Sequence, residues 1–362
     1  MERALRVLMS GAGTGGHLYP GIAVAQELRR RHPSSRVVFA GTGRALEVRV
    51  LREQGFEHRR VRSAGLKGKS LGGLIGGLSM LPLSAWDAWR LVARVAPHLV
   101  IGLGGYSSGA VVLSAALRRV PTLLLEQNAM PGITNRLLAR VVTAAAVSHE
   151  VALPHFRGKG FVSGNPVRSA FFEAGSTPPP PYSGVHLLVL GGSQGAHAIN
   201  VAMMAAAPTL AAVSPSMRVT HQTGERDHGE VSRCYEQVGL TARVEPFLDE
   251  MASALRAADV VVCRAGATTL AELAAVGRPA LLVPLPGAAD GHQRLNADVL
   301  VRGGAAEVMP QEEVTGETLA ERVLGLAADD ARRVQMAAAA RALARPDAAQ
   351  VIVDRAEQLV RS

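Results

Sequence analysis

A glycine-rich segment near the N-terminus contains the first residues that could do chemistry. The apolar run Leu5 to Met9 predicts a short strand, and Ser10-Gly-Ala-Gly-Thr-Gly-Gly-His17 follows it before a helical pattern begins. The glycine spacing satisfies the dinucleotide-binding fingerprint, but the next predicted strand, Arg36 to Ala40, is followed by no acidic residue of the kind that a dinucleotide site needs. Histidine titrates near neutrality, so two roles stay open for His17: general base, or hydrogen-bond partner of the loop.

A second candidate binding segment runs from Val260 to Gly287. Its pattern predicts a strand, a turn, a helix and another strand, with breaks at Gly266 and Gly277. In a parallel sheet, Gly266 to Thr269 would present backbone N–H groups at a helix N-terminus, which favours an anion such as a diphosphate. Glu272 lies one turn farther and could accept hydrogen bonds from ribose hydroxyls. The alternatives are an ordinary helix cap at Thr268 and a surface acid at Glu272.

Polar, glycine-rich turns follow other predicted strands in the first half of the chain. They are Gly104 to Gly109, Glu126 to Asn128 and Pro131 to Arg136. The carboxyl ends of parallel strands meet at one sheet edge, so these turns would hold a phosphorylated or polyhydroxylated substrate there. The candidate acceptor contacts among them are Gly104, Tyr106, Ser107 and Asn135. For Ser107, Ser108 and Asn135 taken singly, ordinary turn chemistry is the alternative.

The second half of the chain has a comparable polar rim. Its members are His221 to Gly224, Pro246 to Asp249, Asp290 to Gln293, and Asn296. The backbone edge at Phe247-Leu248 could receive a flat base, and the Gln293 amide could bond sugar hydroxyls. The chain contains no Asp-x-Asp pair, so we expect no metal and no other cofactor. Helix N-termini would then neutralise a diphosphate instead.

A basic and apolar stretch in the first half suggests contact with a membrane. Lys67 and Lys69 precede Leu71, Leu74, Ile75 and Leu78, and Trp86 and Trp89 follow as the only tryptophans in the chain. The run is too short and too rich in glycine to span a bilayer. Cations beside an apolar, tryptophan-bearing surface nevertheless suit the interface of an anionic membrane. The alternative is a core helix with a solvated basic face.

Composition bounds the elements that must position these residues. The chain has 362 residues, of which 48% are hydrophobic and only 4% aromatic, as is typical of aliphatic α/β layers. A formal charge of +9 favours an anionic partner. Two cysteines give neither a disulfide framework nor a metal cluster, and no cleavable leader is recognisable, so we expect a cytoplasmic protein.

The order of segments predicts two domains of similar design. The proline-rich run within residues 173–184 cannot sustain a helix or a central strand, and we expect a linker there. Val185 to Leu190 then restarts the pattern of strand, glycine-rich turn and helix. We therefore predict an α/β protein with two doubly wound, Rossmann-like domains that face one another across a cleft. Residues 1–172 would bind the acceptor and the membrane, residues 185–345 the donor, and the helix within residues 346–362 could pack back on the first domain.

Motifs along most of the chain carry a resemblance to a known family. In order they are SGAGTGGHLYPGIAVA, GGYSSG, EQNAMPGITNR, GNPVR, GGSQGAHAIN, HQTG, CRAGATTLAE and HQRLNA, from about Val7 to Val308. Together they resemble the MurG family, the lipid-linked N-acetylglucosaminyltransferases of bacterial peptidoglycan synthesis. The resemblance implies a GT-B fold and inverting, metal-independent transfer of N-acetylglucosamine (GlcNAc) from UDP-GlcNAc. The implied acceptor is the C4 hydroxyl of N-acetylmuramic acid (MurNAc) in lipid I, and the product is lipid II.

The resemblance also implies where the protein works and what it meets. It implies a peripheral protein on the cytoplasmic face of the cell membrane, with the hydrophobic stretch near Leu71 to Leu83 against the anionic inner leaflet. Proteins of cell-wall synthesis and cell division are the possible macromolecular partners, and no nucleic acid is expected.

Residue by residue, the resemblance implies donor contacts in both halves of the chain. They are Thr14, Gly15, Gly16, Asn128, Arg168, Ser193, Leu248, Ala267, Thr268, Thr269, Leu270, Ala271, Glu272 and Gln293. In the implied roles, Glu272 grips ribose and Ser193 holds the diphosphate with the adjacent helix N-terminus. Leu248 contacts uracil, Gln293 contacts GlcNAc, and His17 becomes the candidate general base. Many relatives have two glutamines where this chain has His292-Gln293, so no sugar contact is implied for His292.

Three other functions share some of these features. A UDP-GlcNAc 2-epimerase has the same fold and donor, and it would convert the donor without any acceptor. A glycosyltransferase acting on diacylglycerol would share the membrane patch, and competition between diacylglycerol and lipid I would identify it. A nucleotide-binding module without catalytic activity would tolerate His17→Ala in every property except stability.

Overall fold

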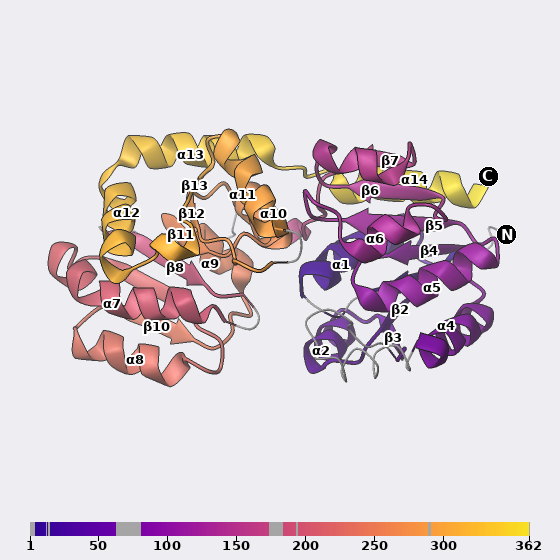
Figure 1. The fold of residues 1–362 in the computed structure, drawn as a ribbon, viewed down its shortest axis with the longest axis horizontal. Coiled ribbons are helices and arrows are strands. Elements are labelled where there is room, and N and C mark those ends of the chain that lie inside the picture. The colour runs from indigo at the N-terminus through magenta and orange to yellow at the C-terminus, as the bar shows by residue number, and fades with distance from the viewer. Residues whose placement is uncertain are drawn as a thin grey trace. The chain divides into compact units, whose positions relative to one another are not determined.

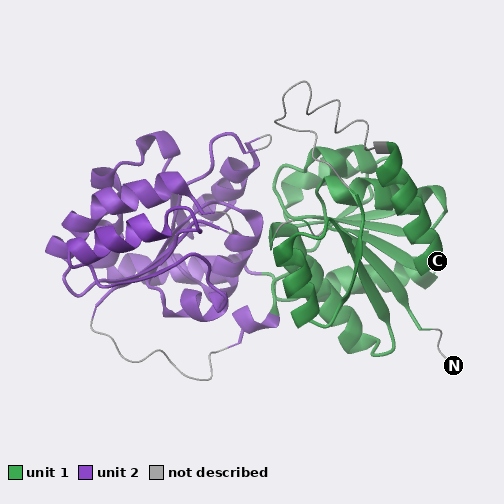
Figure 2. Ribbon diagram, turned by 90° about the horizontal axis from the view of Figure 1, so that it is seen from below, with its two compact units in different colours: residues 1–168, 345–362 green, residues 169–344 purple. Residues whose placement is uncertain are grey.

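The chain forms two α/β units, each organised around its own parallel sheet. The computed structural model describes residues 4–11, 13, 15–62, 81–173, 184–192, 195–288 and 291–361. Unit 1 comprises residues 1–168 and 345–362, and unit 2 comprises residues 169–344 (Figure 2). Every strand pairing in both sheets is parallel, so the predicted class of two doubly wound α/β domains is confirmed.

Unit 1 contains a seven-stranded sheet in the order β3-β2-β1-β4-β5-β6-β7 (Figure 1). The strands are β1 (Arg6–Ser10), β2 (Arg36–Gly41), β3 (Glu57–Arg60), β4 (Leu99–Gly102), β5 (Thr122–Glu126), β6 (Ala144–Val147) and β7 (Gly160–Val162). The helices are α1 (Gly15–Arg31), α2 (Ala45–Glu53), α4 (Leu81–Val95), α5 (Tyr106–Leu117), α6 (Ile133–Leu138), the 3₁₀ helix η1 (Glu150–Phe156) and α14 (Ala348–Arg361).

Alternation along the strands of unit 1 divides its core between the two faces of the sheet. Val7 and Met9 pack in one apolar cluster with residues of α1, α2 and α14. Leu8, which points to the opposite face, packs with residues of α4 and α5 and of the segment from α6 to η1. Because helices cover both faces, the strands are apolar at successive positions, as buried parallel strands require.

Unit 2 contains a six-stranded sheet in the order β10-β9-β8-β11-β12-β13. The strands are β8 (His186–Leu190), β9 (Arg218–Gln222), β10 (Ala242–Glu245), β11 (Val260–Cys263), β12 (Ala280–Leu282) and β13 (Ala306–Val308). The helices are η2 (Ser169–Phe171), α7 (His197–Val213), α8 (His228–Gln237), α9 (Met251–Ala257), α10 (Ala267–Val276), α11 (His292–Arg302), η4 (Gln311–Glu313), α12 (Gly316–Ala328) and α13 (Asp330–Leu343). In each sheet the strand order reverses once, between β1 and β4 and between β8 and β11, and such a reversal is where doubly wound sheets bind ligands.

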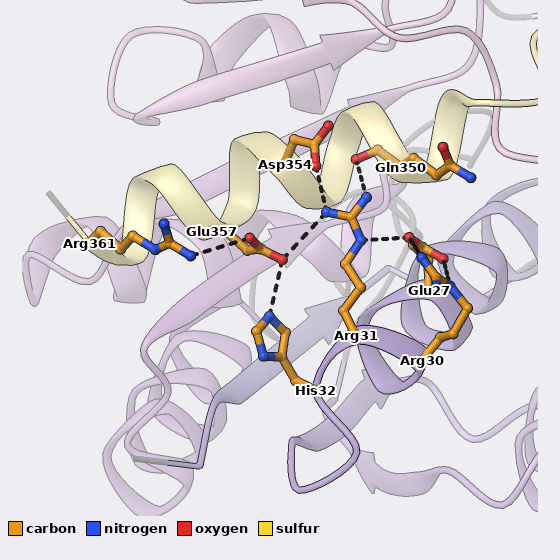
Figure 3. A network of polar contacts seen from close by, with 8 residues as sticks. All are labelled: Glu27, Arg30, Arg31, His32, Gln350, Asp354, Glu357 and Arg361. Carbon is orange, nitrogen blue, oxygen red and sulfur yellow. Dashed lines mark hydrogen bonds and ion pairs between the residues drawn. The ribbon is translucent and has the colours of Figure 1, made fainter. Parts of the chain in front are cut away.

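The last helix, α14, belongs to unit 1 although it follows unit 2 in the chain. Its apolar face enters the unit 1 core through Ile352, Val353, Ala356 and Leu359. At the polar edge, the Glu357 carboxylate lies 3.0 Å from His32 Nε2 and 3.5 Å from Arg31 Nη1 (Figure 3). Burial of each aliphatic side chain is worth about 1.5–3 kcal/mol, whereas an ion pair at the protein surface typically contributes about 0–1 kcal/mol. The apolar face therefore holds this helix in place, and the charges fix its orientation.

Candidate functional site

In unit 1 the loops after β1 and β4 meet at the point where the strand order reverses. A Cβ atom on Gly11 would lie 2.2 Å from the carbonyl oxygen of Gly104, and both residues have positive φ angles, +120° and +104°. Only glycine tolerates this combination of close approach and backbone conformation. The two glycine-rich motifs of the first half of the chain thus contact one another at Gly11 and Gly104.

His17 lies against this junction, in the first turn of α1. A Cβ atom on Gly104 would lie 2.7 Å from His17 Cδ2 and 2.8 Å from Nε2, so the missing side chain makes room for the imidazole. The ring is half-buried, and Gly15 and Gly16 belong to the same helical turn. The structure therefore brings the candidate base together with Gly104, one of the candidate acceptor contacts. Thr14 lies outside the described residues.

The first turn of α5 contributes the next two candidates. The Ser10 hydroxyl at the end of β1 donates to the backbone oxygen of Ser107 at 3.2 Å, which ties the start of α5 to the same sheet edge. Ser107 is buried, whereas the Tyr106 side chain is exposed and accessible to a ligand.

The buried carboxylate of Glu126 organises the loop after β5, and Glu126 was not among the individual site residues predicted from the sequence. Glu126 accepts four hydrogen bonds: from the Asn128 N–H at 3.0 Å, Asn128 Nδ2 at 3.2 Å, the Gly132 N–H at 3.0 Å and Asn135 Nδ2 at 2.9 Å. Burial raises the pKa of the Glu126 carboxyl, and the four donors favour its ionised form. The candidates Asn128 and Asn135 are therefore held on one carboxylate. An acid at the end of an otherwise apolar strand was the signal that could have revealed it.

Arg168, the last candidate in unit 1, stacks on an aromatic ring. Its guanidinium carbon lies 4.4 Å from the centroid of Tyr19, which belongs to α1. This cation–π contact orients a half-buried arginine near the end of the first unit.

In unit 2 the candidate anion site at the start of α10 is present as a helix N-terminus. The N-cap residue is Gly266, which has no side chain to satisfy the first backbone N–H groups of the helix. Thr268 and Glu272 are only 9% and 8% exposed, and Thr268 is not the cap residue. Both alternatives from the sequence, a capping threonine and a surface glutamate, are therefore wrong. The candidates Ala267, Thr268, Thr269, Leu270, Ala271 and Glu272 all lie in the first two turns.

Two further contacts fix α11 and the loop after β12 relative to α10. Asn296 Nδ2 donates to the backbone oxygen of Ala265 at 3.3 Å, immediately before the α10 N-cap. The Leu285 N–H donates to Gln293 Oε1 at 2.9 Å. Arg264, which the sequence did not single out, donates to the Val283 oxygen at 3.1 Å, and burial lowers its pKa. Asn296 thus ties α11, the helix that begins with His292 and Gln293, to the start of α10, where the candidates Ala267 to Glu272 lie.

Two donor candidates of unit 2 remain, Leu248 and Ser193. Leu248 is buried in the loop after β10, and Phe247 beside it is half-buried. Ser193 lies outside the described residues.

The predicted membrane patch is only partly within the described residues. Lys67, Lys69, Leu71, Leu74, Ile75 and Leu78 fall outside them, whereas Trp86 on α4 is 57% exposed. Ala88 and Val92 of α4 are buried, as the alternative of a core helix with a solvated face predicts, whereas Trp86 lies on the exposed side of the helix. In the described part of the chain, no helix is both long enough and apolar enough to cross a membrane. Within the same residues, no group of three or more His, Cys, Asp or Glu side chains could hold a metal ion.

Comparisons with known proteins place both units in one family. Residues 7–147 match the glycosyltransferase family 28 N-terminal domain, and residues 186–352 match the family 28 C-terminal domain. A protein of Anaeromyxobacter sp. (strain K) is 45% identical over 99% of this chain and 94% of its own length. A protein of Geobacter metallireducens is 43% identical over 97% of both chains. Both are named UDP-N-acetylglucosamine--N-acetylmuramyl-(pentapeptide) pyrophosphoryl-undecaprenol N-acetylglucosamine transferase.

Solved structures agree with this relationship. The crystal structure of Acinetobacter baumannii MurG superposes with a TM-score of 0.75 at 31% identity, covering 98% of this chain and 99% of that one. A putative UDP-N-acetylglucosamine 2-epimerase from Listeria monocytogenes has a TM-score of 0.71 over 97% of this chain and 95% of its own, but at 14% identity it shares the fold alone. With GT-B neighbours for its fold and near full-length relatives for its sequence, the chain belongs to the MurG family within glycosyltransferase family 28.

Proposed function

We propose that this protein transfers GlcNAc from UDP-GlcNAc to the C4 hydroxyl of MurNAc in lipid I and so forms lipid II. The observation that carries the proposal is the 45% identity, over nearly the whole chain, to a transferase named for this donor and acceptor. The resemblance of the motifs adds that the reaction inverts the configuration at the anomeric carbon. The roles of individual residues below are part of the proposal.

Unit 2 binds the nucleotide in this proposal. The N-termini of α10 and α7 hold the diphosphate, because helix N-termini carry partial positive charge. Glu272, buried one turn into α10, accepts hydrogen bonds from ribose hydroxyls. The loop at Leu248 contacts uracil. Gln293 directs its amide NH₂ at GlcNAc, since its oxygen already accepts from Leu285.

Unit 1 supplies the base and the acceptor contacts. The acceptor oxygen attacks the anomeric carbon of GlcNAc, the bond from that carbon to the diphosphate oxygen breaks, and UDP leaves. His17 takes the proton of the attacking hydroxyl, and its ring is held for this by the space over Gly104. Exposed Tyr106 and the asparagines on Glu126 contact sugars. In this proposal Gly15, Gly16 and Arg168 also contact the donor. Thr14 of unit 1 and Ser193 of unit 2 do so as well.

A transfer assay with UDP-GlcNAc and a lipid I analogue tests the proposal. Lipid II should form with the acceptor present, at a rate that a chelator leaves unchanged. Formation of UDP-N-acetylmannosamine without acceptor would instead identify an epimerase, and preference for diacylglycerol would identify a different transferase. Absence of any GlcNAc transfer to the lipid I analogue would refute the proposed function.

Substitution of His17 tests the proposed base. His17→Ala should lower turnover roughly a hundredfold or more while the affinity for UDP-GlcNAc stays near wild type, because general base catalysis contributes about 10²–10⁴-fold. His32→Ala is the matched control, since His32 contacts Glu357 of α14 and has no proposed part in the reaction. Near-normal turnover of His17→Ala would exclude it as the base.

Substitution of Glu272 tests the ribose contact. Glu272→Ala should weaken UDP binding roughly 10-fold to 150-fold, which corresponds to about 1.5–3 kcal/mol for charge-assisted hydrogen bonds. Isothermal titration with UDP measures the change. Unaltered affinity in a folded variant would contradict the assignment.

The same proposal includes peripheral binding to the cytoplasmic face of the membrane. On α4 and α5, which pack side by side (Figure 1), Leu83, Trp86, Trp89, Leu113 and Leu117 are exposed. Arginines accompany the aromatic rings: the Arg118 guanidinium lies 3.9 Å from the Trp89 ring centroid, and that of Arg90 lies 5.9 Å from Trp86. Apolar area flanked by cations suits an anionic lipid surface. Membrane-bound enzymes of cell-wall synthesis would be the neighbouring partners.

Flotation with vesicles that contain phosphatidylglycerol tests this surface. The double variant Leu83→Ser, Trp86→Ser should float less than wild type, with the largest difference at low salt. Val213→Ser is the control, because Val213 is an equally exposed apolar residue of unit 2. Equal flotation of all three proteins would return α4 to a purely structural role.

A further inference from the structure

A chain of buried polar side chains in unit 2 leads to the start of α7. Tyr235, His221, Asn200 and Asp227 are each at most 5% exposed. The Tyr235 hydroxyl lies 2.8 Å from His221 Nδ1, and His221 Nε2 lies 3.0 Å from Asn200 Oδ1. Asn200 Nδ2 donates to the Thr223 backbone oxygen at 2.9 Å and to Asp227 Oδ2 at 2.8 Å.

Only one arrangement of protons gives each hydrogen bond of this network a donor and an acceptor. The Thr223 carbonyl oxygen and the Asp227 carboxylate can only accept, so the Asn200 amide must point its NH₂ group toward them and its oxygen toward His221. His221 therefore carries its proton on Nε2, and its Nδ1 accepts from the Tyr235 hydroxyl. Burial lowers the pKa of His221 to about 3, which keeps this neutral tautomer in place at physiological pH.

This hydrogen-bonded network reaches two segments at the edge of the sheet where the loops after the strands meet: the start of α7 and the turn before it. Asn200 lies in the first turn of α7, and His197, the first residue of that helix, places Nδ1 3.0 Å from the same Asp227 carboxylate. The Thr223 carbonyl that accepts from Asn200 also faces Gly195, where a Cβ atom would lie only 2.3 Å from the oxygen. These contacts thus fix both the α7 N-terminus and Gly195 in the glycine-rich turn before it.

Stability alone does not explain so many buried polar groups. Replacing a paired set of buried polar side chains by apolar groups of the same shape is often neutral, whereas leaving one member unpaired is costly. A fully satisfied network restricts a site to a single geometry, because any displacement leaves a polar group without a partner. A helix N-terminus that must meet a diphosphate benefits from that restriction, since its N–H groups have to point at fixed oxygens.

We propose that Tyr235, His221 and Asn200 are positioning residues, which hold Gly195 and the first turn of α7 in the geometry that binds the donor diphosphate. The proposal rests on the proposed function, because it takes that helix end as the diphosphate site. It predicts an effect on phosphate binding that is separate from any effect on folding. It also predicts no effect on the acceptor, whose proposed contacts lie in unit 1.

Binding and kinetics of the full-length protein test the proposal. His221→Phe keeps a ring but removes both hydrogen bonds, and we expect the Kd for UDP to rise roughly tenfold. Tyr235→Phe removes one hydroxyl at the far end of the chain, and we expect a smaller rise of about threefold. The KM for UDP-GlcNAc should rise by the same factors, while the KM for the lipid I analogue and the Kd for uridine stay within twofold of wild type.

His186→Phe is the matched control. His186 also bonds two partners, Thr220 Oγ1 of β9 at 2.9 Å and the oxygen of Ala257 at the end of α9 at 3.0 Å, but it begins β8 and so lies at the amino end of the sheet. It should lower the thermal midpoint without changing the Kd for UDP. If His221→Phe and Tyr235→Phe lower the midpoint and leave the Kd unchanged, the network is purely structural and the proposal fails. If the wild type does not bind UDP, the proposed function itself fails.

Discussion

Acid should destabilise unit 2 through His221, which is fully buried on β9. Its pKa is lowered to about 3 in the folded protein, against about 6.5 in an unfolded chain. As the pH falls below 6.5 the unfolded state takes up a proton that the folded state refuses, so stability is lost progressively until the pH approaches 3. From pH 7 to pH 5 this histidine should lower the free energy of unfolding by about 2 kcal/mol, since each pH unit below 6.5 costs at most about 1.4 kcal/mol.

The groups that face His221 do not titrate in that interval. Asp227 has a lowered pKa because its hydrogen bonds from Asn200 and His197 outweigh the effect of its burial, so it stays ionised well below pH 5. Burial raises the pKa of Tyr235, so its hydroxyl remains protonated. The loss between pH 7 and pH 5 can therefore be attributed to the imidazole once other histidines are subtracted.

Native-state hydrogen exchange of peptides covering β8 and β9, corrected for the intrinsic exchange rate at each pH, measures the effect. The tryptophans, Trp86 and Trp89, are both in unit 1, so tryptophan fluorescence would not report on this unit. His221→Phe should be less stable than wild type at pH 7, but its further loss on going to pH 5 should be smaller by about 2 kcal/mol. An identical pH dependence in both proteins would refute the claim that a neutral buried histidine carries the acid sensitivity.

Four other substitutions probe three local features of the fold. Thr315→Ala should lower the free energy of unfolding of unit 2 by about 1 kcal/mol in urea, because Thr315 caps α12 through the Thr318 N–H at 3.2 Å; no change would mean that the cap is dispensable. Glu126→Gln should cost about 1–3 kcal/mol in thermal unfolding of unit 1, since an amide nitrogen then faces donors, and a neutral result would contradict the four-donor geometry. Glu357→Gln should lower the free energy of unfolding by less than about 1 kcal/mol, whereas Ile352→Ala should lower it by about 2–5 kcal/mol. If urea unfolding gave the reverse order, charge and not apolar packing would hold α14.

Patterns close in sequence predicted much of the site. The run from Leu5 to His17 identified a strand, a glycine-rich turn and a histidine at a helix start, because each feature depends on neighbours within a few residues. Gly266 was placed at the start of a helix and Glu272 on that helix for the same reason. The burial of Glu272 was not decided by the helical pattern, since a lone acid in the first turns of a helix is equally typical of a solvated face.

Contacts between distant segments could not be read in this way. Gly11 and Gly104 lie in different motifs, and only the meeting of β1 with β4 shows why both must be glycine. Glu126 reads as the polar end of a strand until its partners Asn128 and Asn135 are seen around it. The hydrogen bonds of His221 reach α7 and α8, and nothing in the HQTG motif indicates which helices cover that strand.

By itself the sequence determined the class of fold, the repetition of one design in two halves and the family, because periodicity and motifs are properties of short segments. Tertiary structure alone decided that Glu126 accepts hydrogen bonds from two asparagines, and that a buried histidine is joined to the start of α7. The physical reason is that hydrogen bonds and close packing depend on which loops and helices converge at a sheet edge. That convergence is fixed by the order of the strands, which local pattern does not encode.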